Sequence, residues 1–318
     1  MHQPLIILSP PRSFSSVVST IIGEHPQLYG FPELHLFGAE TVEELIRKEQ
    51  KGGNVAGPPG VLRTLAQEHD QVQTSATITK GIAWLHERKH WSTKKLLDYL
   101  FDLVNPKIAV EKSPGTASKT KHIERAYAMY PQAYYLHLTR HPLSARNSIH
   151  EFFTTKKRSR EGVNSYLKSS VDSLLVWFLV HTNIVNFTNS LPVGQTMRIK
   201  GEDLLSQPDI YLPQIAQWLG LRTDAEAIEA MKHPENSPYA CIGPFPACGG
   251  NDPKFMRSPK LRQGRVKEPS LQTFWETENW EWITAQVKKW LTENAFEVGS
   301  KQEIMAEITR LANSMGYQ

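Results

Sequence analysis

The chain has 318 residues, of which 40% are apolar and 21% charged, a composition that excludes global disorder and provides for a sizeable core. Its formal net charge of +4 suits anionic small ligands as readily as nucleic acid, and a dedicated nucleic-acid binder usually has a denser basic patch. Two cysteines cannot build a disulfide framework, the N-terminus lacks a signal-peptide pattern and no apolar run reaches ~18 residues, so we expect a cytoplasmic protein without a membrane span or a nucleic-acid partner.

The chain begins with the pattern of a strand, a turn and a helix. Leu5–Leu8 is a continuous apolar run, which is typical of a strand buried on both faces. The polar turn Ser9–Ser13 ends that run, and residues 15–22 then carry branched aliphatic side chains on one side of a predicted helix. Later segments repeat this order, a strand and then a helix: 108–110 and the residues up to about 130, 134–139 and 143–153, and 195–199 and 208–219.

Strands that alternate with helices favour an α/β fold, with a parallel sheet and helices on both faces. We predict a single domain over residues 1–318, with a helical and loop insertion at about 38–105 and an irregular C-terminal loop at about 233–265. Within and after these segments the pattern predicts a Gly/Pro-rich exposed loop at 51–60, helices over 61–105 with Ser92 as the N-cap of a helix at 93–103, and helices over 275–313.

The strand-to-helix junctions carry basic residues, namely Arg12, Lys112 and Arg140. Because ligands of parallel sheets bind at the carboxyl ends of the strands, we expect these cations at one edge of the sheet. The first junction adds the amides and hydroxyls of Ser13, Ser15 and Ser16 at a helix N-terminus, where anions bind. It is not a Walker A motif, because the glycines and the Gly-Lys-Ser/Thr ending are absent. The alternative is a helix cap beside a surface arginine.

Two of these junctions resemble the signatures of sulfotransferases that use 3′-phosphoadenosine 5′-phosphosulfate (PAPS). They are the run Pro11-Arg12-Ser13-Phe14-Ser15-Ser16, and Arg140 with Ser148 eight residues later. The resemblance spans most of the chain and implies a parallel sheet like that of P-loop NTPases, flanked by helices. It implies that the first run, Arg12 to Ser16, holds the 5′-phosphosulfate, and that Arg140 and Ser148 hold the 3′-phosphate of PAPS and of its product PAP. Phe14 stands where the family usually has Gly, which leaves the path of this loop open.

The resemblance also implies catalytic roles. Sulfuryl transfer, like phosphoryl transfer, needs cations around the transferred group and a base for the acceptor. Glu33 is the candidate base, His35 competes with it because imidazole titrates near neutrality, and alternation would put both on one side. Lys112, together with Arg12, would stabilise the charge on the transferred group. The alternatives are a loop carboxylate paired with an arginine, a capping histidine and a solvated lysine.

The C-terminal loop matches the family only in part. Arg262 and Gly264 resemble an Arg-Lys-Gly stretch that contacts the 3′-phosphate in cytosolic sulfotransferases, and a solvated basic loop is the alternative. Gly201 replaces a Tyr that can contact adenine, so adenine recognition must differ. The run Gly249–Pro253 resembles bacterial members found alone and within polyketide synthases. We expect the loops at 38–60 and 236–262 to close over the substrate.

The resemblance implies, as acceptor, a hydroxyl or amine of a small molecule, or a hydroxyl on a carrier-protein-bound acyl chain. It implies no metal, because cationic side chains take that role. A nucleotide-dependent kinase would share the fold, but the sequence lacks Gly-Lys-Ser/Thr and a clear acidic magnesium site. Residues 86–90 match the zinc motif H-E-x-x-H, but the cap at Ser92 predicts that the preceding helix ends near His90. A non-catalytic binding module would have no need of Glu33, Arg12 and Lys112 together.

Overall fold

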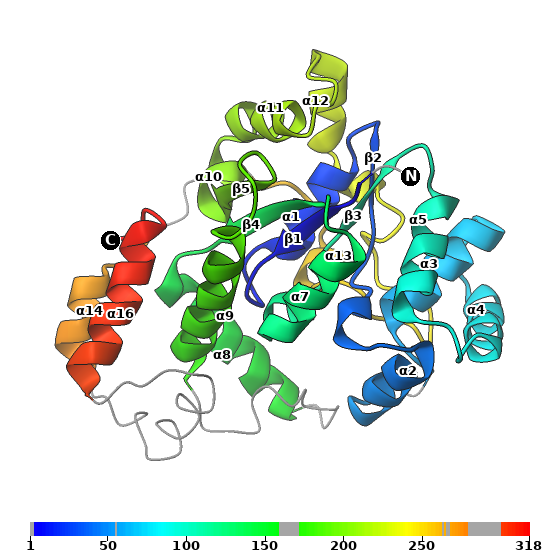
Figure 1. Ribbon diagram of the computed structural model, residues 1–318, viewed down its shortest axis with the longest axis horizontal. Helices are drawn as coiled ribbons and strands as arrows, with labels where there is room; N and C mark the ends of the chain where they lie inside the picture. Colours follow the sequence, from blue (N-terminus) through cyan, green and yellow to red (C-terminus); the bar gives the residue numbers. More distant parts are fainter. Residues whose placement is uncertain (1–2, 55, 159–171, 263, 265–267, 279–299) are drawn as a thin grey trace.

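A five-stranded parallel sheet forms the centre of the computed structural model, which describes residues 3–54, 56–158, 172–262, 264, 268–278 and 300–318 (Figure 1). The strands are β1 (Leu5–Leu8), β2 (Leu28–Gly30), β3 (Ile108–Glu111), β4 (Tyr134–Thr139) and β5 (Thr196–Lys200), in the order β2-β3-β1-β4-β5. β1 pairs in parallel with β3 on one side and β4 on the other. The predicted α/β fold is confirmed, and only β2, three residues long, was not predicted.

Helices cover both faces of the sheet because successive side chains of a strand point to opposite faces. Ile6 and Leu8 of β1 belong to one core cluster, whereas Leu5 and Ile7 belong to another. The first cluster is completed by helices α3 (Pro59–Asp70), α5 (Thr93–Leu103) and α7 (Thr120–Met129). The second is completed by α1 (Ser15–Gly23), α11 (Pro208–Trp218) and α12 (Ala225–Met231).

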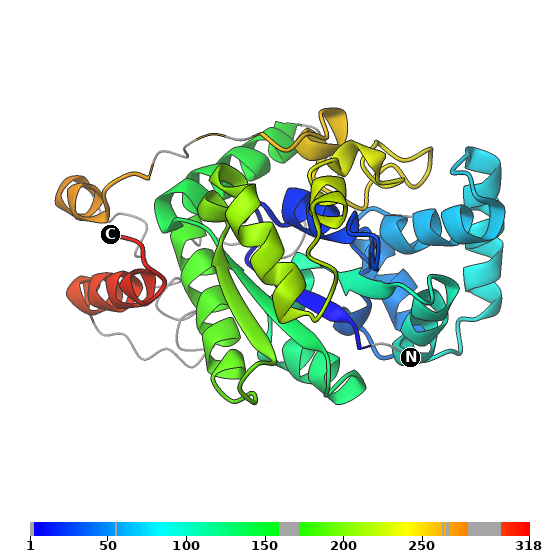
Figure 2. The same ribbon diagram turned by 90° about the horizontal axis from the view of Figure 1, so that it is seen from above.

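The predicted insertion forms one end of the molecule, with α2 (Val42–Lys51), α3, α4 (Ser75–Glu87) and α5 (Figures 1 and 2). The prediction of a loop over 38–60 is wrong for α2. Its N-cap is Thr41, whose hydroxyl accepts a hydrogen bond from the backbone amide of Glu44. That Thr-x-x-Glu spacing is a helix-start signal. The predicted cap at Ser92 is confirmed by its bond to the Lys95 amide. α4 ends at Glu87, so the two histidines of the H-E-x-x-H pattern do not share a helix.

The opposite end holds a third cluster, made by α8 (Pro142–Arg158), α9 (Ser173–Thr188), α14 (Leu271–Thr277) and α16 (Lys301–Ser314). α9 was not predicted because it is apolar on most sides, and it packs against both the first and the third cluster. Of the helical stretch predicted at 275–313, residues 279–299 lie outside the described residues. None of the described helices is both long and apolar enough to cross a bilayer.

The irregular loop after α12 is positioned by a buried arginine. Arg63 on α3 is fully buried and donates to the carbonyls of Gly249 (3.1 Å) and Pro238 (3.4 Å). Because a buried guanidinium needs acceptors, these carbonyls fix the loop against α3. The loop contains η3 (Pro234–Asn236) and α13 (Pro253–Arg257) and passes beside α1, where the Asp252 amide donates to Ser16 (Figure 2).

Candidate active site

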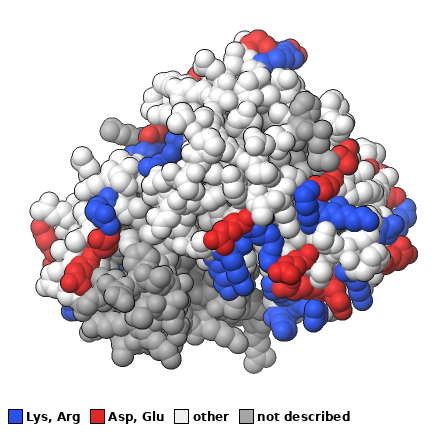
Figure 3. All heavy atoms as spheres, in the orientation of Figure 1, with Lys and Arg blue, Asp and Glu red and all other residues white. Residues whose placement is uncertain are grey.

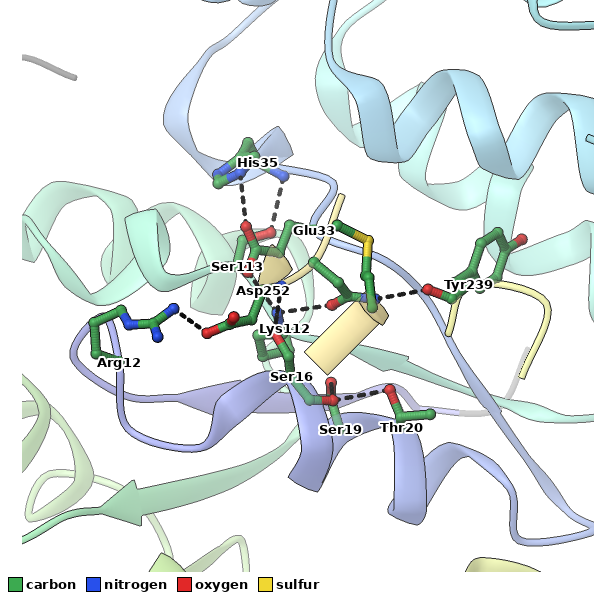
Figure 4. Close-up of polar contacts among 12 residues, drawn as sticks. Arg12, Ser16, Ser19, Thr20, Glu33, His35, Lys112, Ser113, Tyr239 and Asp252 are labelled. Carbon is green, nitrogen blue, oxygen red and sulfur yellow. Dashed lines mark hydrogen bonds and ion pairs between the residues drawn. The ribbon is translucent and has the colours of Figure 1, made fainter. Parts of the chain in front are cut away.

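The three basic junctions meet at the carboxyl edge of the sheet. Arg12 follows β1, Lys112 follows β3 and Arg140 follows β4, three strands that are neighbours. From β1 the chain passes to β2 at one edge of the sheet, returns with β3 between β2 and β1, and then continues on the other side of β1 with β4 and β5. Parallel sheets bind ligands where the strand order reverses in this way. Figure 4 shows the polar contacts around Arg12 and Lys112.

The first turn is held in a strained conformation. Arg12 and Phe14 both have positive φ angles, 66° and 61°, which bulky L-residues rarely adopt. Backbone strain of this kind persists where the surroundings enforce it and is concentrated at functional sites. Here the enforcing contact is Arg140, whose guanidinium donates to the Arg12 carbonyl at 2.6 Å. Arg12 Nε in turn donates to Ser148 at 3.3 Å, so the two predicted phosphate signatures lie side by side.

Phe14 and Gly201, the two departures from the family pattern, lie next to each other. The Phe14 ring lies under the Arg140 guanidinium, with 4.2 Å from the guanidinium carbon to the ring centroid. A Cβ placed on Gly201 would be 2.6 Å from the Phe14 ring. The extra side chain at position 14 therefore fills the space left by the missing one at position 201. The Phe14 ring and the Arg140 guanidinium form a favourable cation–π arrangement.

The turn offers donors suited to a phosphate group. Ser13 Oγ and Arg140 Nε are buried and have no hydrogen-bond partner within the described part of the chain. The first turn of α1 receives no side-chain cap from Phe14, although Ser15 and Ser16 are almost fully buried there. Buried donors without partners are rare, and a helix N-terminus attracts anions. The serines therefore fit the phosphosulfate, and Arg140 the 3′-phosphate, that the sequence resemblance implies.

Lys112 is the centre of the site (Figure 4). Its side chain is fully buried, and Nζ donates to Glu33 Oε1 (2.6 Å), Ser16 Oγ (3.1 Å) and Asn251 Oδ1 (3.1 Å). An ammonium group has three N–H donors, so all of them are engaged. The alternative of a solvated lysine is wrong. Any anion that binds Lys112 has to take a donor from one of these three acceptors.

Glu33 and His35 form a pair beside Lys112. His35 Nε2 is 3.5 Å from Glu33 Oε2, and the two side chains are 32% and 22% exposed, so both reach the surface of the site. Burial by itself would raise the pKa of Glu33, but Lys112 and His35 outweigh it and lower that pKa to about 2. Burial would likewise lower the pKa of His35, but Glu33 raises it above its usual value. The pair is thus a carboxylate next to an imidazole that holds its proton more tightly than usual.

Glu111 and Ser113 belong to this network, although the sequence indicated no catalytic role for Glu111, which was expected to face elsewhere and pair with a base. The backbone amide of His35, whose φ is 58°, donates to Ser113 Oγ at 2.9 Å, and that hydroxyl donates to the buried Glu111 carboxylate. Burial raises the pKa of Glu111 to about 7. The end of β3 therefore fixes the position of His35, while Lys112 between them binds Glu33. The signal was available, because both residues flank Lys112.

Asn251 and Asp252 also reach the site. Asn251 accepts from Lys112, and the Asp252 carboxylate pairs with Arg12. The Gly250 carbonyl accepts the Glu33 amide at 2.6 Å, which ties this loop to the segment that carries the candidate base. The run Gly249–Pro253 resembled a branch of the family, but nothing in the sequence indicated which cations its side chains would meet.

The structure does not bring Arg262 and Gly264 to the other candidate residues. Arg262 is exposed and donates to Ser258 at 2.9 Å, and Gly264 has open space around it. Gln263 lies outside the described residues. No three His, Cys, Asp or Glu side chains of the described ranges are placed to hold a metal ion. On the face in Figure 3, Lys and Arg lie next to Asp and Glu, and the described side chains there form no broad basic surface.

Comparison with known proteins gives the family. Residues 4–225, well over half of the chain, match the model of the sulfotransferase family. The fold is similar to that of a sulfotransferase domain from the curacin biosynthetic pathway, with a TM-score of 0.71 at 23% identity over 100% of this chain and 99% of that one. It is also similar to the sulfotransferase domain of the Synechococcus PCC 7002 olefin synthase, with a TM-score of 0.68 at 21% identity over 100% and 95%.

A search among curated proteins found no match to the sequence. The family match and the parallel sheet agree with the prediction made from the strand-to-helix turns. The family match sets aside the kinase, and the end of α4 at Glu87 sets aside the zinc protease. The chain belongs to the sulfotransferase family, and it is an enzyme of that family.

Proposed function

We propose that this sulfotransferase moves a sulfuryl group from PAPS to a hydroxyl or amine of a small or carrier-bound acceptor, with Glu33 as general base. The observation that carries the proposal is the contact of Lys112 with both sides of the site. Its ammonium joins Ser16, in the turn suited to phosphate, to Glu33, on the segment open to an acceptor. A cation between an anion site and a carboxylate is the arrangement that in-line transfer requires.

The residues divide into two phosphate sites. Arg12, with the amides and hydroxyls of the turn up to Ser16, would hold the 5′-phosphosulfate, and Phe14 contributes through its backbone. Arg140 and Ser148 would hold the 3′-phosphate. PAPS supplies the sulfuryl group, and its 5′-phosphate is the leaving group. Lys112 and Arg12 would offset the negative charge that develops on the sulfuryl group and the leaving 5′-phosphate during transfer.

Glu33 would become an effective base only when Lys112 turns toward the bound anion. A carboxylate whose pKa is about 2 takes a proton poorly, and the charge of Lys112 is the largest single cause that lowers this pKa. When Lys112 donates to the phosphosulfate, the Glu33 pKa rises. Glu33 then accepts the proton of the acceptor while the acceptor oxygen attacks sulfur and the bond from sulfur to the 5′-phosphate oxygen breaks. His35 supports the carboxylate through their contact.

Replacement of Arg140 by Ala should weaken PAP binding by about 10- to 100-fold. Charge-assisted hydrogen bonds are worth about 1.5–3 kcal/mol, and the change also removes the bond that holds the Arg12 carbonyl. Isothermal titration calorimetry measures the effect. Arg222→Ala is the control, because Arg222 pairs with Asp224 on the distant helix α12 and should leave PAP affinity unchanged. Equal affinities of Arg140→Ala and the wild type would remove Arg140 from the cofactor site.

The acceptor is proposed from the similar structures. One is a domain from the curacin biosynthetic pathway and the other comes from an olefin synthase, which supports an acceptor made during biosynthesis. The test is incubation with PAPS and two panels, acyl carrier proteins loaded with hydroxyacyl chains and free hydroxyl compounds, followed by mass spectrometry for one added sulfuryl group. Sulfation in either panel that Glu33→Gln abolishes supports the proposal. Sulfation that survives Glu33→Gln would contradict the role of the base.

A further inference from the structure

Two consecutive residues, Asn251 and Asp252, contact Lys112 and Arg12, the two cations proposed to bind the phosphosulfate group. Asn251 Oδ1 accepts from Lys112 at 3.1 Å, and the Asp252 carboxylate pairs with Arg12. The Asp252 amide donates to Ser16 Oγ at 3.0 Å, a hydroxyl of the phosphate-binding turn. Figure 4 shows the contact between Asp252 and Arg12 beside Lys112.

The two side chains are anchored differently. Asn251 is 8% exposed, and its amide nitrogen also donates to the Tyr239 carbonyl at 3.4 Å, so both ends of its side chain are engaged. The Asp252 side chain is 21% exposed, and its second oxygen caps α13 by accepting the Lys254 amide at 2.7 Å. The Asp252 carboxylate is therefore more accessible than the Asn251 amide. Gly250, directly before Asn251, has a φ of 106°, a backbone conformation that other residues rarely adopt.

The carboxylate of Asp252 opposes the binding of an anion at Arg12. Arg12 has one guanidinium, which already donates to Ser148 and pairs with Asp252. A second negative group at the same guanidinium repels the first, because like charges at contact distance are strongly unfavourable in a half-buried site. An Asn at this position would cap α13 equally well without that repulsion.

We propose that Asp252 sets the affinity for the cofactor, because its carboxylate occupies Arg12 in the absence of ligand and competes with the anionic 5′-group for that guanidinium. This inference rests on the proposed function. It has a kinetic consequence: the carboxylate that returns to Arg12 promotes release of the anionic product PAP.

The test is calorimetric titration of the Asp252→Asn protein with PAP. The variant keeps the side-chain volume and the helix cap and loses only the charge, so its PAP affinity should rise by about tenfold, the effect of one charge-assisted contact. Stopped-flow measurement should show that the gain is mainly slower PAP dissociation. Asp224→Asn is the matched control, because Asp224 also caps a helix and pairs with an arginine, but on α12. Its PAP affinity should equal that of the wild type.

A second variant keeps the proposal testable if Asp252→Asn fails to fold. Asp252→Ser also caps a helix without a charge and should tighten PAP binding in the same direction. Weaker or unchanged PAP binding in a folded uncharged variant would overturn the inference and make Asp252 a residue that positions Arg12. Failure of the wild type itself to bind PAP would be a different result, because it would overturn the proposed function along with the inference.

Discussion

Glu33→Gln is expected to lower turnover by about 10²–10⁴-fold while the variant still binds PAP. The amide keeps the shape of the side chain and can still accept a hydrogen bond from Lys112, but it cannot take a proton from the acceptor. Turnover is measured with an acceptor from the sulfation screen, and PAP binding by calorimetry. Normal turnover of Glu33→Gln would show that Glu33 is not the base, and His35 would be the next residue to replace.

The same variant has a second readout in the imidazole of His35. The negative charge of Glu33 raises the pKa of His35, so its removal should lower that pKa toward the ordinary value of about 6.5. Titration of the His35 ring protons by NMR checks the direction. A His35 pKa that did not move would contradict the pairing of Glu33 with His35.

Lys112→Met is expected to lower turnover by about 10²–10³-fold, the usual cost of one lost donor to developing negative charge. The thioether has similar length but no charge, so the proposed site loses its central cation and Glu33 loses its hydrogen bond to Lys112. Because Lys112 lowers the pKa of Glu33, that pKa should rise in the variant. The turnover assay and the pH dependence of the residual activity measure both effects.

Lys119→Met is the control for this substitution. Lys119 lies a few residues beyond the same strand, at the N-terminus of α7, and is exposed. Its replacement should leave turnover and PAP affinity at the wild-type values. If Lys112→Met kept wild-type turnover with intact folding, the central role of Lys112 in charge stabilisation would have to be abandoned.

The basic junctions could be predicted because local patterns and one topological rule decide where they lie. Apolar runs located β1, β3 and β4, and the carboxyl ends of neighbouring parallel strands meet at one edge. Arg12, Lys112 and Arg140 therefore had to lie near one another, and the bond between Arg140 and the Arg12 carbonyl shows how closely. α2 escaped prediction because the nearby Gly/Pro-rich stretch outweighed a valid cap signal at Thr41.

The contacts of the loop that carries Asn251 and Asp252 could not be predicted, because they join residues that are far apart in the sequence. Asp252 meets Arg12 across 240 positions, and Asn251 meets Lys112 across 139. The path of this loop is fixed by Arg63, a buried charge whose contacts to the loop include the backbone carbonyls of Gly249 and Pro238, which carry no sequence signal. The fit of the Phe14 ring into the space beside Gly201 is likewise visible only in three dimensions, although each departure was evident in the sequence.

The most direct test of the account is calorimetric binding of PAP, with ADP plus Mg²⁺ as the comparison. It needs no knowledge of the acceptor, and it examines the two phosphate sites on which the proposed roles of Arg12 and Arg140 depend. We expect tight binding of PAP and weak binding of ADP, because only PAP carries the 3′-phosphate that Arg140 and Ser148 would hold. Absence of PAP binding, or a preference for ADP with Mg²⁺, would contradict the use of PAPS at this site.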